Sequence, residues 1–195
     1  MAGQGSYVRA RAFLRRPLAF ARETGEMLVE ALHHLGNVEL ALGNLVEARR
    51  LNREMLRLSE GWDFSFGLAV ALIGAARVAL AKGELAEARA QLLRAFTIRW
   101  RSFPILHTIE ALATMAEVEQ AEGRLEAAAE LCAALLSWPA TPNYAPETVQ
   151  RLRQELASRL QKLEAQLSVE IYAAAVARGR ARSVEEIVAK VAEGS

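Results

Sequence analysis

Few residues of this chain could do chemistry, and they decide which kinds of site to expect. The histidines are His33, His34 and His107, and Cys132 is the single cysteine. Adjacent side chains on a helix point about 100° apart, so His33 and His34 do not face one metal ion together. His107 is remote from both in sequence. We therefore expect no metal site.

Catalytic motifs are equally scarce. The sequence has no H-E-x-x-H, C-x-x-C or G-x-S-x-G motif and no G-x-x-x-x-G-K-[ST] phosphate loop. Asp63 is the only aspartate, which leaves few paired carboxylates for hydrolysis or Mg²⁺ binding. Cys132 cannot form an internal disulfide, so we expect a small buried thiol in a reducing compartment. These observations predict a chain that is not an enzyme and has no cofactor.

Composition narrows the partners. The 195 residues are 52% hydrophobic and 24% charged, with a formal net charge of +1. This balance gives no overall attraction to nucleic acid or to an anionic membrane. No apolar run approaches the roughly 20 residues that a transmembrane helix needs. We therefore expect a cytoplasmic protein with no direct contact to nucleic acid and no membrane association.

An internal repeat positions the remaining residues. Gly43, Gly83 and Gly123 are spaced by 40 residues, and each lies between two segments with apolar residues at helical spacing. Each glycine is expected to end one helix in the left-handed conformation. Asn44 is expected to cap the helix that follows Gly43. The sequence predicts three helical hairpins within 29–148, as units 29–68, 69–108 and 109–148.

The two ends depart from this pattern. Gly5 precedes Gly43 by 38 residues, so we expect 1–28 to hold a half-repeat, a second helix of about 6–22 without its first helix. Helical patterns at about 146–166 and 168–178, and a capping box at 183–186, predict that 149–195 forms capping helices over the last repeat.

Two surfaces are candidates for binding. In stacked hairpins the first helices line a concave groove, and residues spaced i, i+3, i+7 share one face. The same residues could instead be solvated or could join neighbouring repeats. The second surface is helix 6–22, whose apolar residues would face an absent neighbour and could support self-association. The groove candidates are Glu30, His33, Asn37, Val70, Ile73, Arg77, Glu110, Glu117 and Gln120, and the self-association candidates are Tyr7, Phe13, Leu14 and Phe20.

The repeat resembles a known family. Leu35-Gly36, and Gly43 followed by Leu45 and Ala48, resemble the tetratricopeptide repeat, in a longer form of about 40 residues. This resemblance implies an all-α, right-handed α-solenoid of helical hairpins with a C-terminal helical cap. His33 with Asn37 resembles half of a clamp that holds a peptide carboxylate in some such domains, although the clamp's lysines are absent.

The long repeats and the ending at 171–186 are similar to the C-terminal region of bacterial maltose-regulator-like and STAND-type signal-transducing ATPases and transcriptional activators. The resemblance implies a non-catalytic scaffold that binds a protein or peptide, as the sensor or partner-binding part of such an ATPase. The ATPase module itself is missing from this sequence. The alternative is a structural module that forms a homodimer through helix 6–22.

Overall fold

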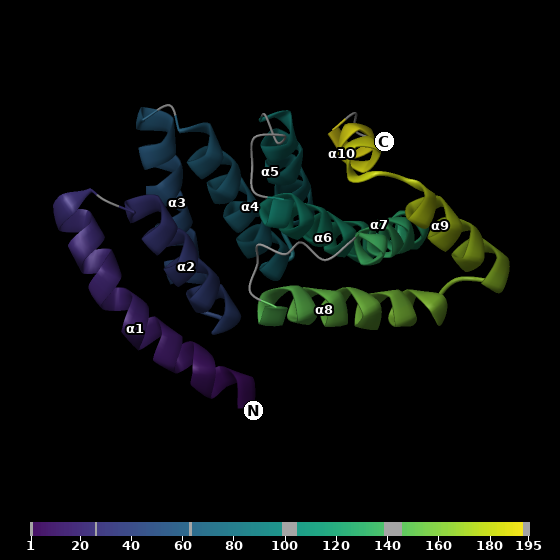
Figure 1. Ribbon diagram of the computed structural model, residues 1–195, viewed down its shortest axis with the longest axis horizontal. Coiled ribbons are helices and arrows are strands. Elements are labelled where there is room, and N and C mark those ends of the chain that lie inside the picture. Colours follow the sequence, from purple (N-terminus) through teal and green to yellow (C-terminus); the bar gives the residue numbers. More distant parts are fainter. Residues whose placement is uncertain (1, 26, 63, 99–104, 139–145, 193–195) are drawn as a thin grey trace. The chain divides into compact units, whose positions relative to one another are not determined.

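The computed structural model describes residues 2–25, 27–62, 64–98, 105–138 and 146–192. The chain divides into two compact units, Met1–Ser102 and Phe103–Ser195, and we describe each by itself. Unit 1 holds α1 (Ala2–Thr24), α2 (Leu28–Ala41), α3 (Leu45–Gly61), α4 (Ser65–Ala81) and α5 (Leu85–Thr97). Unit 2 holds α6 (Ile105–Ala121), α7 (Leu125–Ser137), α8 (Pro146–Glu164), α9 (Val169–Ala181) and α10 (Val184–Ala192) (Figure 1).

The predicted all-α fold class is confirmed. All secondary structure in the described part of the chain is helical, and α2 with α3, α4 with α5 and α6 with α7 pack as hairpins. The pattern-based helices about 6–22, 146–166 and 168–178 correspond to α1, α8 and α9.

The glycine turns adopt the predicted conformation. Gly43, Gly83 and Gly123 have φ angles of 78°, 75° and 80°, where only glycine avoids a Cβ clash. The Gly43 amide donates to the Leu40 carbonyl (3.0 Å), and the next amide, at Asn44, donates to the Glu39 carbonyl (2.8 Å). This pair of bonds is the Schellman motif, which satisfies carbonyls left open at a helix end.

The predicted N-cap role of Asn44 is wrong. Its side chain makes no capping hydrogen bond to α3; instead Nδ2 donates to Glu39 Oε2 at 2.6 Å. Glu39 is only 4% exposed, and a buried carboxylate needs donors more than a solvated helix end does. In the third repeat Arg124 makes the equivalent contact to buried Glu119. In the first and third repeats the residue after the glycine therefore reaches back to the preceding helix, whereas Glu84 of the second repeat pairs with Lys82.

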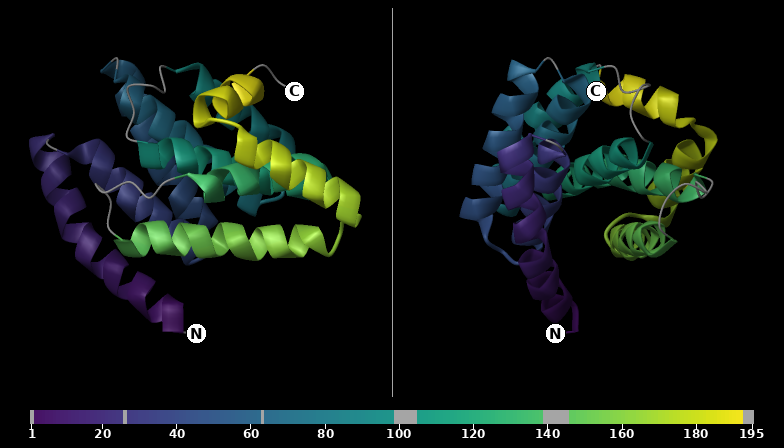
Figure 2. Two further views of the ribbon diagram at one scale, coloured as in Figure 1. Left: turned by 45° about the vertical axis from the view of Figure 1, so that its right-hand side comes forward. Right: turned by 60° about the vertical axis from the view of Figure 1, so that its left-hand side comes forward.

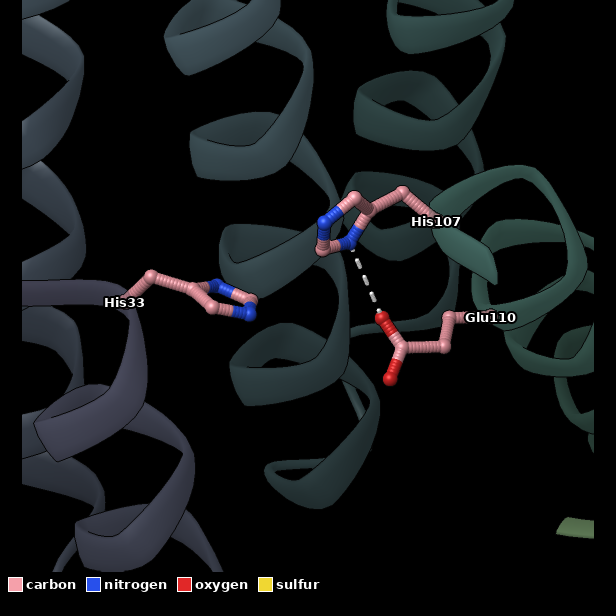
Figure 3. Close-up of side chains that lie close together, drawn as sticks. All are labelled: His33, His107 and Glu110. Atoms are coloured by element: carbon pink, nitrogen blue, oxygen red, sulfur yellow. Dashed lines mark hydrogen bonds and ion pairs between the residues drawn. The ribbon is translucent and has the colours of Figure 1, made fainter. Parts of the chain in front are cut away.

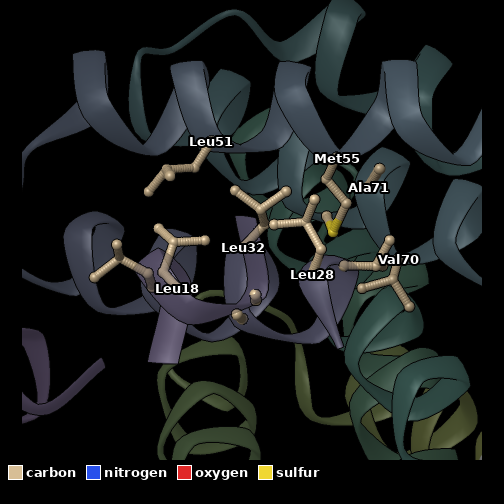
Figure 4. Close-up of a cluster of buried hydrophobic side chains, with 11 residues drawn as sticks. Leu18, Leu28, Leu32, Leu51, Met55, Val70 and Ala71 are labelled. Atoms are coloured by element: carbon tan, nitrogen blue, oxygen red, sulfur yellow. The ribbon is translucent and has the colours of Figure 1, made fainter. Parts of the chain in front are cut away.

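The core of unit 1 joins side chains from four helices, α1 to α4. Leu18 from α1, Leu28 and Leu32 from α2, and Leu51 and Met55 from α3 meet in one buried cluster (Figure 4). Helices α1 and α2, α2 and α3, α3 and α4, and α4 and α5 are in contact along the chain. Each helix is thus held on the face that its apolar positions predict.

In unit 2, α7 is the central element. It contacts α6, α8, α9 and α10 (Figure 2). A Cβ at Gly179 of α9 would lie 2.2 Å from the Glu130 carbonyl oxygen, so only glycine permits this approach of α9 to α7. Leu163 of α8 is fully buried. The C-terminal helices therefore cover faces of α7 that would otherwise be open.

A buried carboxylate ties these helices together. Glu130 of α7 accepts hydrogen bonds from Arg178 (3.0 Å), Lys190 (2.9 Å) and Arg182. Burial acts to raise the pKa of Glu130, but the hydrogen bonds from Lys190 and Arg178 and the charge of Arg182 outweigh it and lower the pKa below the ordinary value.

The predicted capping box is confirmed. The Glu186 amide donates to Ser183 Oγ (3.2 Å), and the Ser183 amide donates to the Glu186 carboxylate (2.7 Å). These two bonds fix the start of α10, the helix that carries Lys190 to Glu130.

Candidate partner-binding surfaces

A row of polar side chains runs from α2 to α4 in unit 1. Arg77 Nη1 donates to Asn37 Oδ1 (2.9 Å), and Asn37 Nδ2 lies 3.0 Å from His33 Nε2. Because an arginine can only donate, the Asn37 oxygen faces Arg77 and its NH₂ group faces His33. His33 then accepts at Nε2 and carries its proton on Nδ1. Three of the predicted groove residues therefore form one hydrogen-bonded row.

The row joins neighbouring repeats. Asn37 and Arg77 occupy equivalent positions 40 residues apart, and both are half-buried. Among the described residues Arg77 has no carboxylate partner, only the neutral Asn37 amide. A guanidinium that is half-buried and not neutralised keeps donors and positive charge for an anionic group.

Two of the groove candidates, Val70 and Ile73, are buried. Val70 is 3% exposed and belongs to the core cluster, and Ile73 is 6% exposed. The expectation that these two residues line an open surface is therefore wrong, because the neighbouring helices pack over them. Glu30, at the start of the α2 face, is half-buried.

The unit 2 candidates have partners within that unit. Glu110 lies 3.2 Å from His107 Nδ1, one helical turn earlier (Figure 3). Glu117 and Gln120 both face α8, because Arg159 Nη2 lies 3.1 Å from Glu117 Oε1 and Arg159 Nη1 donates to Gln120 Oε1 at 2.7 Å. The negative charge of Glu117 is thus neutralised from within the chain.

Sequence reasoning missed Arg159. The repeat period could not reveal this contact, because Arg159 lies in α8, outside the repeated hairpins. Sequence reasoning also missed a pocket of about 160 Å³ between α3, α4 and α5. Arg49 and Arg53 line this pocket together with Glu84 and Gln91. Its walls come from two hairpins, so no local spacing reveals it.

The four apolar candidates on α1 lie on two different faces. Leu14 is half-buried and packs against the core cluster, and Tyr7 is half-buried. Phe13 and Phe20 are 76% and 60% exposed. The expectation that all four face an absent neighbour is wrong for Leu14, because α2 covers its side of the helix.

Cys132 is buried, as expected. Burial raises the pKa of its thiol to about 12, with Arg159 acting in the opposite direction. The reactive thiolate is therefore scarce at neutral pH, and Cys132 has the properties of a core residue.

The comparisons with known proteins agree with this geometry. Residues 27–99 match the family model described as tetratricopeptide repeat, and the match spans α2 to α5 of unit 1. The comparisons with curated proteins and with solved structures found no match. None of the described helices is long and apolar enough to cross a membrane. Residues 27–99 are therefore similar to tetratricopeptide repeats, a type of repeat that generally mediates protein–protein interaction.

Proposed function

We propose that this chain is a protein- or peptide-binding scaffold, acting in the bacterial cytoplasm as the partner-binding part of a signal-transducing or transcription-regulating ATPase. The tetratricopeptide match over α2 to α5 is the observation that carries the scaffold role. The ATPase context rests on the resemblance of the long repeats and of the ending at 171–186. In such a system the chain would bind a partner, and this binding would regulate the ATPase.

The polar row of unit 1, His33, Asn37 and Arg77, is the proposed contact for the partner. Arg77 holds a half-buried charge against a neutral amide, whereas Glu117 of unit 2 is already paired with Arg159. A carboxylate of an extended peptide would meet the free donors of Arg77 and displace little of the existing structure. We therefore propose that the partner presents an acidic group to this row.

Isothermal titration with a panel of extended peptides, each carrying one internal or C-terminal carboxylate, tests this proposal. Arg77→Glu reverses the charge in the row, and we expect it to weaken binding at least about tenfold, which is about 1.4 kcal/mol. Arg57→Glu is the matched control, since Arg57 is exposed on α3 and outside the row. Equal affinity of wild type and Arg77→Glu for a bound peptide would contradict the assignment.

A further inference from the structure

Each position of α1 can be matched to a position of α3 38 residues later, so the contacts of α3 indicate what could pack on each face of α1. With Gly5 aligned to Gly43, Leu18 of α1 corresponds to Leu56 of α3, and both lie at the core cluster on the side of the next hairpin. Phe13 corresponds to Leu51. Leu51 is fully buried and packs in the cluster with Leu32 of α2 (Figure 4), whereas Phe13 is 76% exposed. One face of α1 is therefore covered and the other is open.

The open face has a regular pattern. Arg9, Phe13, Arg16 and Phe20 follow at i, i+4, i+7 and i+11, the spacing of one helical stripe, and all four are exposed. We call these four residues the α1 stripe. Among the described residues neither Arg9 nor Arg16 has an acidic partner. Two other arginines of α1 do have one.

Those two arginines lie on the covered side of the helix. Arg22 Nη2 is 2.7 Å from Glu54 of α3, and Arg11 Nη1 is 4.0 Å from Glu39 of α2. Of the three arginines of α1 that have no acidic partner among the described residues, Arg9 and Arg16 lie on the same stripe as the exposed aromatic rings and Arg15 does not. The exposed carboxylate of Glu23 follows Phe20 by three residues, so the stripe carries two positive charges and one negative charge.

The charge of the stripe is reversed relative to α3. Positions 9 and 16 of α1 correspond to Glu47 and Glu54 of α3, both of which pair with Arg50. On α3, Glu54 also pairs with Arg22 of the neighbouring helix α1. A helix that packed beside positions 9 and 16 of α1 would meet two arginines instead of two glutamates. Its flanks would have to be acidic to match.

We propose that the α1 stripe docks an acidic amphipathic helix of a partner protein. Leucines of the partner would cover Phe13 and Phe20, and its glutamates would pair with Arg9 and Arg16. Charge complementarity and the shared register select this occupant. The surface is separate from the Arg77 row, so each proposal can fail without the other.

Two other occupants fit less well. A second copy of the chain packed in parallel on this stripe would bring Arg9 and Arg16 of both molecules together, and like charges repel. A membrane-surface helix needs a broad apolar face, but Leu18 and Ala21 of α1 are already buried. What remains is a narrow stripe suited to one helix.

A matched pair of synthetic peptides tests the proposal with the full chain. The first is an amphipathic helix with leucines at every third or fourth position and glutamates on both flanks; the second has lysine at each glutamate position. By fluorescence anisotropy we expect the acidic peptide to bind in the micromolar range and the lysine peptide at least about tenfold more weakly. Raising the salt concentration should weaken the binding of the acidic peptide.

Variants of exposed residues identify the surface without disturbing the core. Phe13→Ser with Phe20→Ser should abolish binding, and Arg9→Glu with Arg16→Glu should reverse the preference, so that the lysine peptide binds more tightly. Val46→Ser is the control, since Val46 is 88% exposed on α3. Arg77→Glu should leave this binding unchanged, which separates the result from the Arg77 row. Unaltered circular dichroism confirms that each variant is folded.

Four outcomes would overturn the proposal. The first is no binding of the acidic peptide to the wild type, and the second is equal affinity for both peptides or no change in the variants. The third is a dimer in sedimentation that is lost in the phenylalanine variant, which would assign the stripe to a second copy. The fourth is co-sedimentation with phosphatidylserine-containing vesicles that is lost in the same variant, which would assign it to a membrane.

Discussion

Helices α7 and α1 differ in how completely the chain covers them. Gly179 lets α9 lie against the backbone of α7. Glu130 of α7 accepts hydrogen bonds from Arg178 of α9, from Arg182 just after α9 and from Lys190 of α10. On α1, Leu18 is buried but Phe13 and Phe20 are left in solvent. Within the described residues α7 is covered by four other helices, whereas one face of α1 is exposed. The exposed face of α1 is the one that we propose to dock a partner helix.

Substitutions of Leu51 and Phe13 should differ most in their effect on the free energy of unfolding. The two residues share one register position, but Leu51 is fully buried and Phe13 is 76% exposed. We expect Leu51→Ala to lower the free energy of unfolding by about 3 kcal/mol and Phe13→Ala to change it by less than about 0.5 kcal/mol. Urea unfolding followed by circular dichroism measures both. A large loss in Phe13→Ala would show that α1 is covered after all.

A substitution at the close approach of α9 to α7 should have an intermediate effect on stability. An alanine Cβ at position 179 would overlap the Glu130 carbonyl oxygen, which belongs to the backbone and cannot rotate away. We expect Gly179→Ala to cost about 2 kcal/mol, within the range for overpacking. Gly5→Ala is the matched control, because nothing lies within 4 Å of its Cβ position and alanine favours a helix. If both variants were equally stable in thermal unfolding, α9 would not be held against α7.

Substitution of Glu130, which pairs with Arg178, Arg182 and Lys190, should have the smallest effect on stability. Glu130→Gln removes the carboxylate but keeps a hydrogen-bonding side chain, and we expect a loss of about 1 kcal/mol at neutral pH, because its partners are partly solvated. The pKa of Glu130 is lowered in the folded state, so its contribution is present above the unfolded pKa and is lost as the pH falls through the folded pKa.

The pH dependence provides a second measurement of this cluster. Unfolding free energies of wild type and Glu130→Gln, taken from neutral pH down to the acid range, should converge as the carboxylate becomes protonated. Glu126→Gln, at the exposed partner of Arg178, serves as the control and should have a smaller effect. A difference that stays constant with pH would indicate a packing change rather than a lost charge.

The polar row of His33, Asn37 and Arg77 shows which contacts the sequence could predict and which it could not. The period of 40 residues placed Asn37, Arg77 and Glu117 at equivalent positions, and the structure shows Asn37 and Arg77 in one hydrogen-bonded pair. The period could not show that Arg159 takes Glu117 or that Val70 is buried in the core. Both depend on where a neighbouring helix lies, which local spacing does not encode.

What the sequence alone determined is local. The three glycine turns, the apolar faces of the helices and the capping box at Ser183 follow from contacts within one turn of the chain, so residue type and spacing suffice to predict them. Tertiary structure decided that Asn44 turns to Glu39 instead of capping α3, and that Leu14 is covered while Phe13 is not. The physical reason is that the burial of Glu39 and of Leu14 depends on helices distant in sequence, and only the packed helices bring those segments together.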